Sequence, residues 1–225
     1  MGVSKYACAL NVKSEAELRL KTQQFSKKVK NSDNDFYDMA ISQKFANIDP
    51  ENQVKLQTGY ISDESWGNHQ IFYALAPATS DDANKPVIFW VSGGPGGSLV
   101  IFWRSLGGPV TESKKTGFKF NKWTWSKFAN IVIVDYPYGT GYSRFSSSKL
   151  HYKDERKENQ RFGKFMEKWF EKHPKYNKSD IWLSGDCASA SMEPSMLNKA
   201  YKSFYESYGN RLKGIIQEGP EIDMR

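Results

Sequence analysis

The chain has 225 residues, of which 39% are hydrophobic and 15% aromatic, and its formal net charge is +7. This length predicts a single domain, and a charged fraction of 25% argues against extensive disorder. No apolar run approaches the roughly 20 residues that span a bilayer. Two cysteines and three unclustered histidines give neither a disulfide framework nor a metal-ligand pattern, so we expect no metal and no other cofactor.

Residues 1–50 are expected to form an accessory arm. Ser14 and Glu17 fit a capping box before a lysine-rich helix, and the loop-like segment KNSDND follows. The first twenty residues lack the apolar segment of a secretory signal, which indicates an intracellular protein. The alternative is a secretory or lysosomal protein whose amino terminus is processed or engineered.

Residues 51–225 are predicted to form one α/β domain. The alternating segments VKLQTGYIS (54–62) and HQIFYALAP (69–77) suit an antiparallel strand pair at a sheet edge. Continuous apolar runs at 86–92 and 129–136 are typical of strands buried on both faces. Shorter runs of the same character follow at 180–184 and 213–217.

Two amphipathic helices are predicted between these later strands. Apolar residues at helical spacing occur from Phe162 to Phe170 and again from Met192 to Tyr208. Strands that alternate with amphipathic helices predict a mainly parallel central sheet flanked by helices.

Positive charge is concentrated between residues 144 and 178, which contain eleven Lys or Arg against five Asp or Glu. This segment is interpreted either as a solvated helix face or as a docking surface for an acidic protein, an anionic membrane or RNA. The sequence contains no specific nucleic-acid-binding motif.

Three glycine-rich turns each follow a predicted strand: GGPGGS at 93–98, PYGTGYS at 137–143 and GDCASA at 185–190. Because the carboxyl ends of parallel strands share one edge of the sheet, these turns are expected to converge there. In the third turn, Cys187 has small neighbours, which a strained strand-to-helix turn requires.

These segments resemble the serine carboxypeptidase family of α/β-hydrolases over about residues 55–223. The segment WVSGGPGGS is similar to the family's W-L-N-G-G-P-G-C-S-S, and DYPYGTGYS to its D-Q-P-x-G-x-G-[FY]-S. GDCASA is similar to the nucleophile turn G-E-S-Y-A-G, and LKGIIQEGPEID to L-x-G-I-x-I-G-N-G-x-x-D. The resemblance implies a partial α/β-hydrolase fold that lacks the C-terminal part.

The resemblance also implies roles for five residues. Cys187 stands at the nucleophile position, and the backbone N–H groups of Gly94 and Ala188 occupy the oxyanion-hole positions. Ser92 and Asp186 replace the asparagine and glutamate that hold the substrate's terminal carboxylate in the family, and both are shorter.

The general base is missing from the expected place. Hydrolases of this fold place the acid and the histidine after the nucleophile, whereas His69, His151 and His173 all precede Cys187. His173 is expected to be a surface or capping residue. Without a base, Cys187 is expected to be almost inert, acting as a small apolar residue in a tight turn.

The preferred hypothesis is a catalytically degenerate, serine-carboxypeptidase-like subunit of a larger assembly, in which other protein subunits cover the incomplete sheet. One alternative is a peptidase or other hydrolase whose Asp and His come from another chain or from an absent C-terminal part. Another is a non-catalytic module that binds a peptide or an acyl group.

Overall fold

The computed structural model describes residues 56–62, 69–94, 96–98, 107–113, 117–144, 155–190, 204 and 206–220. The predicted arm at 1–50 lies outside these residues. The main elements follow in chain order: β1 (Gln57–Ser62), β2 (Gln70–Ala76), β3 (Val87–Val91), β4 (Val110–Ser113), β5 (Gly117–Phe120), β6 (Asn130–Asp135), α4 (Glu155–Lys172), β7 (Ile181–Asp186) and β8 (Leu212–Glu218).

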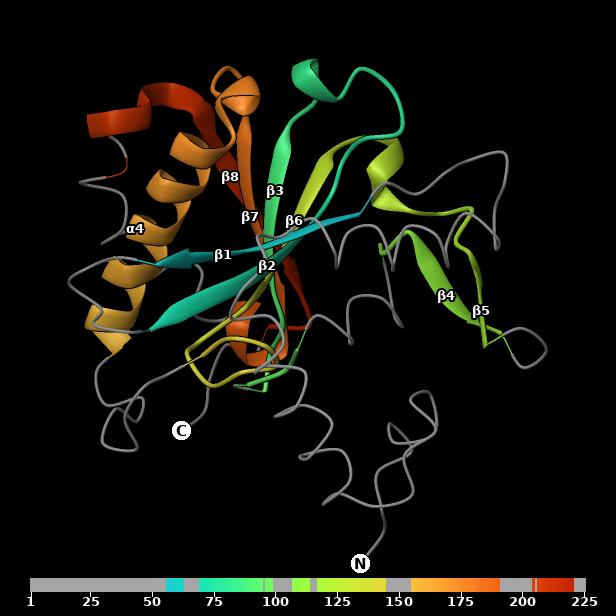
Figure 1. Ribbon diagram of the computed structural model, residues 1–225, viewed down its shortest axis with the longest axis horizontal. Coiled ribbons are helices and arrows are strands. Elements are labelled where there is room, and N and C mark those ends of the chain that lie inside the picture. The colour runs from blue at the N-terminus through green and yellow to red at the C-terminus, as the bar shows by residue number, and fades with distance from the viewer. Residues whose placement is uncertain are drawn as a thin grey trace, which may run out of the picture.

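A six-stranded sheet forms the centre of the fold, with strand order β1-β2-β6-β3-β7-β8 (Figure 1). β1 pairs antiparallel with β2, and β2 pairs antiparallel with β6. The pairs formed by β6, β3, β7 and β8 are all parallel. The predicted fold class is therefore confirmed, including the antiparallel pair at one edge.

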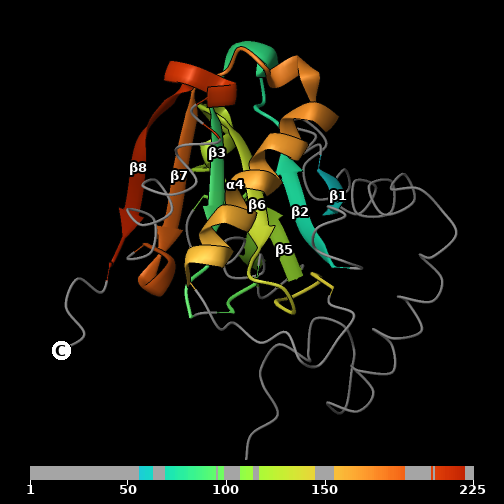
Figure 2. The same cartoon turned by 90° about the vertical axis from the view of Figure 1, so that its left-hand side faces the viewer.

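Helix α4 packs against one face of this sheet, as its apolar spacing predicts (Figure 2). Phe162, Phe165, Met166, Trp169 and Phe170 are all buried, because residues three and four apart share one side of a helix. They contact side chains that project from the strands; the Phe89 ring, for example, lies 5.3 Å from Trp169 and 5.7 Å from Phe170.

The opposite face of the sheet has its own apolar cluster, which explains the continuous apolar runs in the sequence. Phe72, Trp90 and Ile133 are buried there, and Trp125 and Ile216 pack against them. Because successive residues of a strand point to opposite faces, a strand covered on both sides requires apolar residues at every position.

Strands β4 and β5 form a separate antiparallel hairpin that the sequence did not lead us to predict. In Figure 1 this hairpin lies beside the central sheet. Each strand has only four residues, VTES in β4 and GFKF in β5, which is too short for a sustained period of polar and apolar residues.

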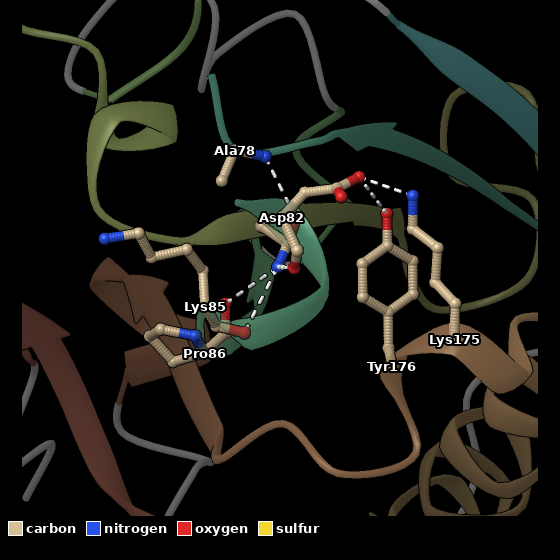
Figure 3. Close-up of polar contacts among 7 residues, drawn as sticks. Ala78, Asp82, Lys85, Pro86, Lys175 and Tyr176 are labelled. Atoms are coloured by element: carbon tan, nitrogen blue, oxygen red, sulfur yellow. Dashed lines mark hydrogen bonds and ion pairs between the residues drawn. The ribbon is translucent and has the colours of Figure 1, made fainter. Parts of the chain in front are cut away.

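A polar network closes the edge of the sheet at which the parallel strands begin. Buried Asn130 accepts a hydrogen bond from the Ala78 N–H at 2.9 Å and donates to the Asp82 carbonyl oxygen at 2.7 Å. The Asp82 carboxylate accepts from Lys175 and Tyr176 in the 3-10 turn η6 (Pro174–Tyr176), as Figure 3 shows. The start of β6 is thereby tied to the segment that precedes β7.

A membrane-spanning helix, judged by length and hydropathy, does not occur among the described residues.

Candidate functional site

The three glycine-rich turns meet at the edge of the sheet where β3, β6 and β7 end. The space around each glycine shows how closely the turns pack, because a Cβ atom added there would lie very near atoms of a neighbouring turn. A Cβ on Gly93 would lie 2.7 Å from Cys187 Cβ, and one on Gly96 would lie 3.9 Å from Thr140 Oγ1. One on Gly141 would lie 2.7 Å from Ser98 Oγ. The predicted convergence of the turns is confirmed.

Cys187 lies at the apex of a strand-to-helix turn. β7 ends at Asp186, residues 187–190 are helical, and Cys187 itself has a φ of 50°. This left-handed conformation is costly for a residue with a side chain, and it is the geometry of a nucleophile elbow. The buried Ser189 hydroxyl stabilises the turn by approaching the Val91 carbonyl oxygen at 2.6 Å and that of Asp186 at 2.9 Å.

Gly93 allows the first turn to approach the elbow, a role that sequence reasoning missed. The Gly93 N–H donates to Asp186 Oδ1 at 2.8 Å, and a Cβ at this position would overlap the Asp186 carbonyl oxygen. The signal in the sequence is the first glycine of GGPGG, directly after the strand.

The two proposed oxyanion-hole positions flank this contact. Gly94 has a φ of 127°, which favours glycine, and it directly follows the residue that touches the elbow. A Cβ on Gly93 would lie 3.1 Å from the Ala188 nitrogen. The backbone of the first turn therefore runs beside the N–H group of Ala188, where a substrate carbonyl oxygen would need donors.

The second turn is built around the buried carboxylate of Asp135. Asp135 Oδ2 accepts from the Tyr142 N–H at 2.8 Å, and the Asp135 carbonyl oxygen accepts from the Ser143 hydroxyl at 2.5 Å. Gly141 has a φ of 52°, and a Cβ there would lie 2.5 Å from Asp135 Cγ. The aspartate and the glycine therefore shape this turn together.

The two positions that resemble the family's carboxylate-binding pair differ in their surroundings. Ser92 is only 2% exposed, and a Cβ on Gly97 would lie 2.9 Å from Ser92 Cβ, so Gly97 covers the serine. Asp186 is half-buried and already accepts from Gly93. Opposite it in the β7–β8 register stands Glu218, whose pKa is raised by burial and by the Asp186 carboxylate.

His173 lies far from Cys187, because α4 carries the chain from the edge that holds the turns to the opposite edge (Figure 2). Its Nε2 is hydrogen-bonded to the Tyr73 hydroxyl at 2.8 Å, and its ring lies 4.5 Å from Trp169. Burial, together with Lys172 and Lys175, lowers the pKa of His173 to about 4. The expectation of a surface or capping residue holds only in part: His173 follows α4 and is the N-cap residue of η6, but its ring is half-buried in an aromatic cluster and makes no side-chain capping hydrogen bond.

His69 lies at the same edge as the turns, directly before β2. It is 3% exposed and packs 5.0 Å from the Tyr138 ring. β2 is three strands from β7, which corresponds to about 14 Å at the usual spacing of neighbouring strands. His151, the third histidine, lies outside the described residues.

No group of three or more His, Cys, Asp or Glu side chains suited to a metal ion occurs within the described ranges. Among the described residues, the groups around the elbow are the Cys187 thiol, the backbone N–H groups beside it and the Asp186 and Glu218 carboxyl groups.

Comparison with known proteins agrees with this architecture. The family model for serine carboxypeptidases matches residues 46–223. Serine carboxypeptidase-like 8 of Arabidopsis thaliana is 29% identical over 163 residues, which cover 67% of this chain and 36% of the relative. Serine carboxypeptidase-like 16 of the same plant is 28% identical over 183 residues, covering 75% of this chain and 41% of the relative.

Among solved structures, a prohormone-processing carboxypeptidase from Saccharomyces cerevisiae superimposes with a TM-score of 0.65 at 22% identity. The match covers 78% of this chain and 40% of the yeast enzyme, and at this identity it supports the fold alone. The chain thus spans less than half the length of the relatives it matches. The family match and the three convergent turns establish that the chain belongs to the serine carboxypeptidase family.

Proposed function

We propose that this chain is a catalytically degenerate member of the family, which acts through protein contacts as a subunit of a larger assembly. The observation that carries the proposal is the separation of the elbow from the described histidines. Cys187 has the strained backbone of a nucleophile, yet His173 lies at the opposite edge and His69 three strands away. In hydrolases of this fold a histidine beside the nucleophile acts as its general base, and neither described histidine lies on a strand next to β7.

The surroundings of the relic carboxylate positions support the same proposal. Ser92 is covered by Gly97, and the Asp186 carboxylate is committed to the Gly93 N–H. Glu218 adds a second carboxyl group beside Asp186, at a position where the family motif has glycine. Where both groups are ionised, they would repel a substrate's terminal carboxylate.

The edge strand β8 supports a role in assembly. Within the described residues β8 pairs with β7 alone, and its side chains at Leu212, Ile215 and Ile216 are only partly buried. An edge strand with unpaired backbone groups and half-covered apolar side chains is a template for another strand. We propose that another polypeptide segment covers this edge.

A second candidate is a hydrolase that is completed by an Asp and a His from another segment. The retained geometry favours it, because Cys187 keeps a φ of 50° and Gly94 a φ of 127°. Gly93 also leaves the space beside the thiol-bearing turn free of a side chain. These features are what a tetrahedral intermediate on a cysteine nucleophile requires from the backbone.

The test is to purify the tagged gene product from its source cells after fractionation, which also tests the predicted intracellular location. Intact mass gives the length of the product, and hydrolysis of peptide and ester substrates is measured for it and for Cys187→Ala. Cys8→Ala serves as the matched control, because Cys8 is the only other cysteine. A stoichiometric complex without Cys187-dependent hydrolysis is the expected result.

Lysine cross-linking of that complex locates the contact. Lys213 on β8 is exposed and should cross-link to the partner, whereas Lys164 on α4 should not. Hydrolysis that Cys187→Ala abolishes and Cys8→Ala preserves would overturn the proposal in favour of the second candidate. Cross-links confined to α4 would contradict the placement of the partner at β8.

A further inference from the structure

Two large aromatic side chains project from residues 119–128, the segment that joins the end of β5 to β6, and we call this segment the basic-aromatic turn. Trp123 is 74% exposed and Phe128 is 69% exposed. The other exposed large hydrophobic residue of the described ranges, Tyr142, is 41% exposed. Exposed apolar area is unfavourable in water, so two such rings on one short turn suggest a contact surface.

The exposure of both rings is built into the local backbone. The Asn121 side chain donates to the Gly108 carbonyl oxygen at 2.9 Å and accepts from the Trp123 N–H at 3.0 Å. The Phe128 N–H donates to the Trp125 carbonyl oxygen at 2.8 Å, which closes the 3-10 turn η5 (Trp125–Lys127). Buried Thr124 caps this turn by accepting from the Ser126 N–H. The turn thus presents the two rings from a hydrogen-bonded frame.

Positive charge accompanies the rings. Residues 119–128 contain three lysines and no aspartate or glutamate. The Lys122 ammonium lies 5.1 Å from the centre of the Trp123 ring. Lys127 Nζ donates to the Lys122 carbonyl oxygen at 2.6 Å, which holds its charge on the same turn. All three lysine side chains are exposed.

We propose that the basic-aromatic turn binds peripherally to an anionic membrane surface. Trp and Phe rings favour the boundary between head groups and acyl chains, and lysines beside them are attracted to anionic head groups. An acidic protein would explain the lysines but would leave the exposure of both rings unexplained. A neutral apolar partner would explain the rings but not the absence of acidic residues. The inference is independent of the proposed function, because it uses no residue of the turns around Cys187.

The test is sedimentation of the full chain with vesicles of phosphatidylcholine, with or without phosphatidylserine. We expect binding to the anionic vesicles that weakens as salt is added. The paired substitution of Trp123→Ser and Phe128→Ser, and separately that of Lys122→Gln and Lys127→Gln, should each reduce the affinity about tenfold or more. Circular dichroism should be unchanged, because all four side chains are exposed.

Two controls match these variants. Tyr142→Ser removes an exposed ring at the opposite end of β6, and the pair Lys168→Gln and Lys172→Gln removes two charges from the basic helix α4. Both controls should bind as the unaltered chain does. Equal loss in the α4 control, equal binding to neutral vesicles, or failure to bind vesicles while an acidic polypeptide is bound would each overturn the proposal.

Discussion

Lowering the pH from 7 to 5 is expected to destabilise the folded chain through one side chain, His173. In the folded chain, burial and two nearby lysines lower the pKa of His173 from 6.5 to about 4. Between these values the unfolded chain binds a proton that the folded chain does not. The stabilisation is therefore fully present above pH 6.5, declines as the pH falls and is lost below about pH 4.

The two pKa values set the size of the effect. A change from 6.5 to about 4 corresponds to at most about 3.4 kcal/mol, since each unit is worth about 1.4 kcal/mol. The ring is only half-buried, so water screens part of the penalty, and we expect a loss of about 1–2 kcal/mol between pH 7 and pH 5. If the neutral His173 ring accepts the hydrogen bond from the Tyr73 hydroxyl, protonation of the ring breaks this bond and adds to the loss of stability.

Urea unfolding, followed by tryptophan fluorescence, measures this loss. The unaltered chain and His173→Gln are compared at pH 7 and pH 5, so that carboxylates and other histidines cancel in the difference. Tyr73→Phe retains the histidine but removes its hydroxyl partner, and its pH dependence should lie between the two. If His173→Gln loses as much stability on acidification as the unaltered chain, His173 does not carry the effect and the reasoning is refuted.

Three further substitutions and one control substitution test the packing of the site and its supports by urea unfolding. Gly93→Ala should cost about 1–3 kcal/mol, because its Cβ would overlap Asp186; the control Gly219→Ala, which meets nothing within 4 Å, should cost only the strain of its φ of 56°. Asn130→Ala should cost about 3 kcal/mol by leaving buried backbone groups without partners. Lys175→Ala should cost less than about 1 kcal/mol, since its ion pair is exposed. A Gly219 variant that loses more stability than the Gly93 variant would contradict these assignments. An Asn130 variant as stable as the Lys175 variant would contradict them as well.

Strong periodicity made much of the fold predictable from the sequence. The apolar runs at 86–92 and 129–136 became β3 and β6, which are covered on both faces, and the spacing from Phe162 to Phe170 became α4. The hairpin of β4 and β5 was missed because its short strands carry no sustained pattern. The predicted helix from Met192 to Tyr208 falls mostly outside the described residues.

The candidate site was predictable only in its local geometry. Small residues around Cys187 indicated a tight turn, and its φ of 50° agrees with that. The bond between the Gly93 N–H and Asp186 joins residues 93 positions apart, and no local pattern reports such a pairing. The half-burial of His173 was missed for a related reason, since its ring is hydrogen-bonded to Tyr73, which lies 100 positions away.

The packing of the three turns bears on how such motifs persist over evolutionary time. Gly93 fits against Cys187 and Asp186, Gly97 covers Ser92, and Gly141 fits against Asp135. Each contact serves folding whether or not a substrate is ever turned over. Selection for a folded protein therefore suffices to preserve these signature residues after an enzyme has lost its reaction. Their presence in a sequence indicates descent from the family and not, by itself, a present reaction.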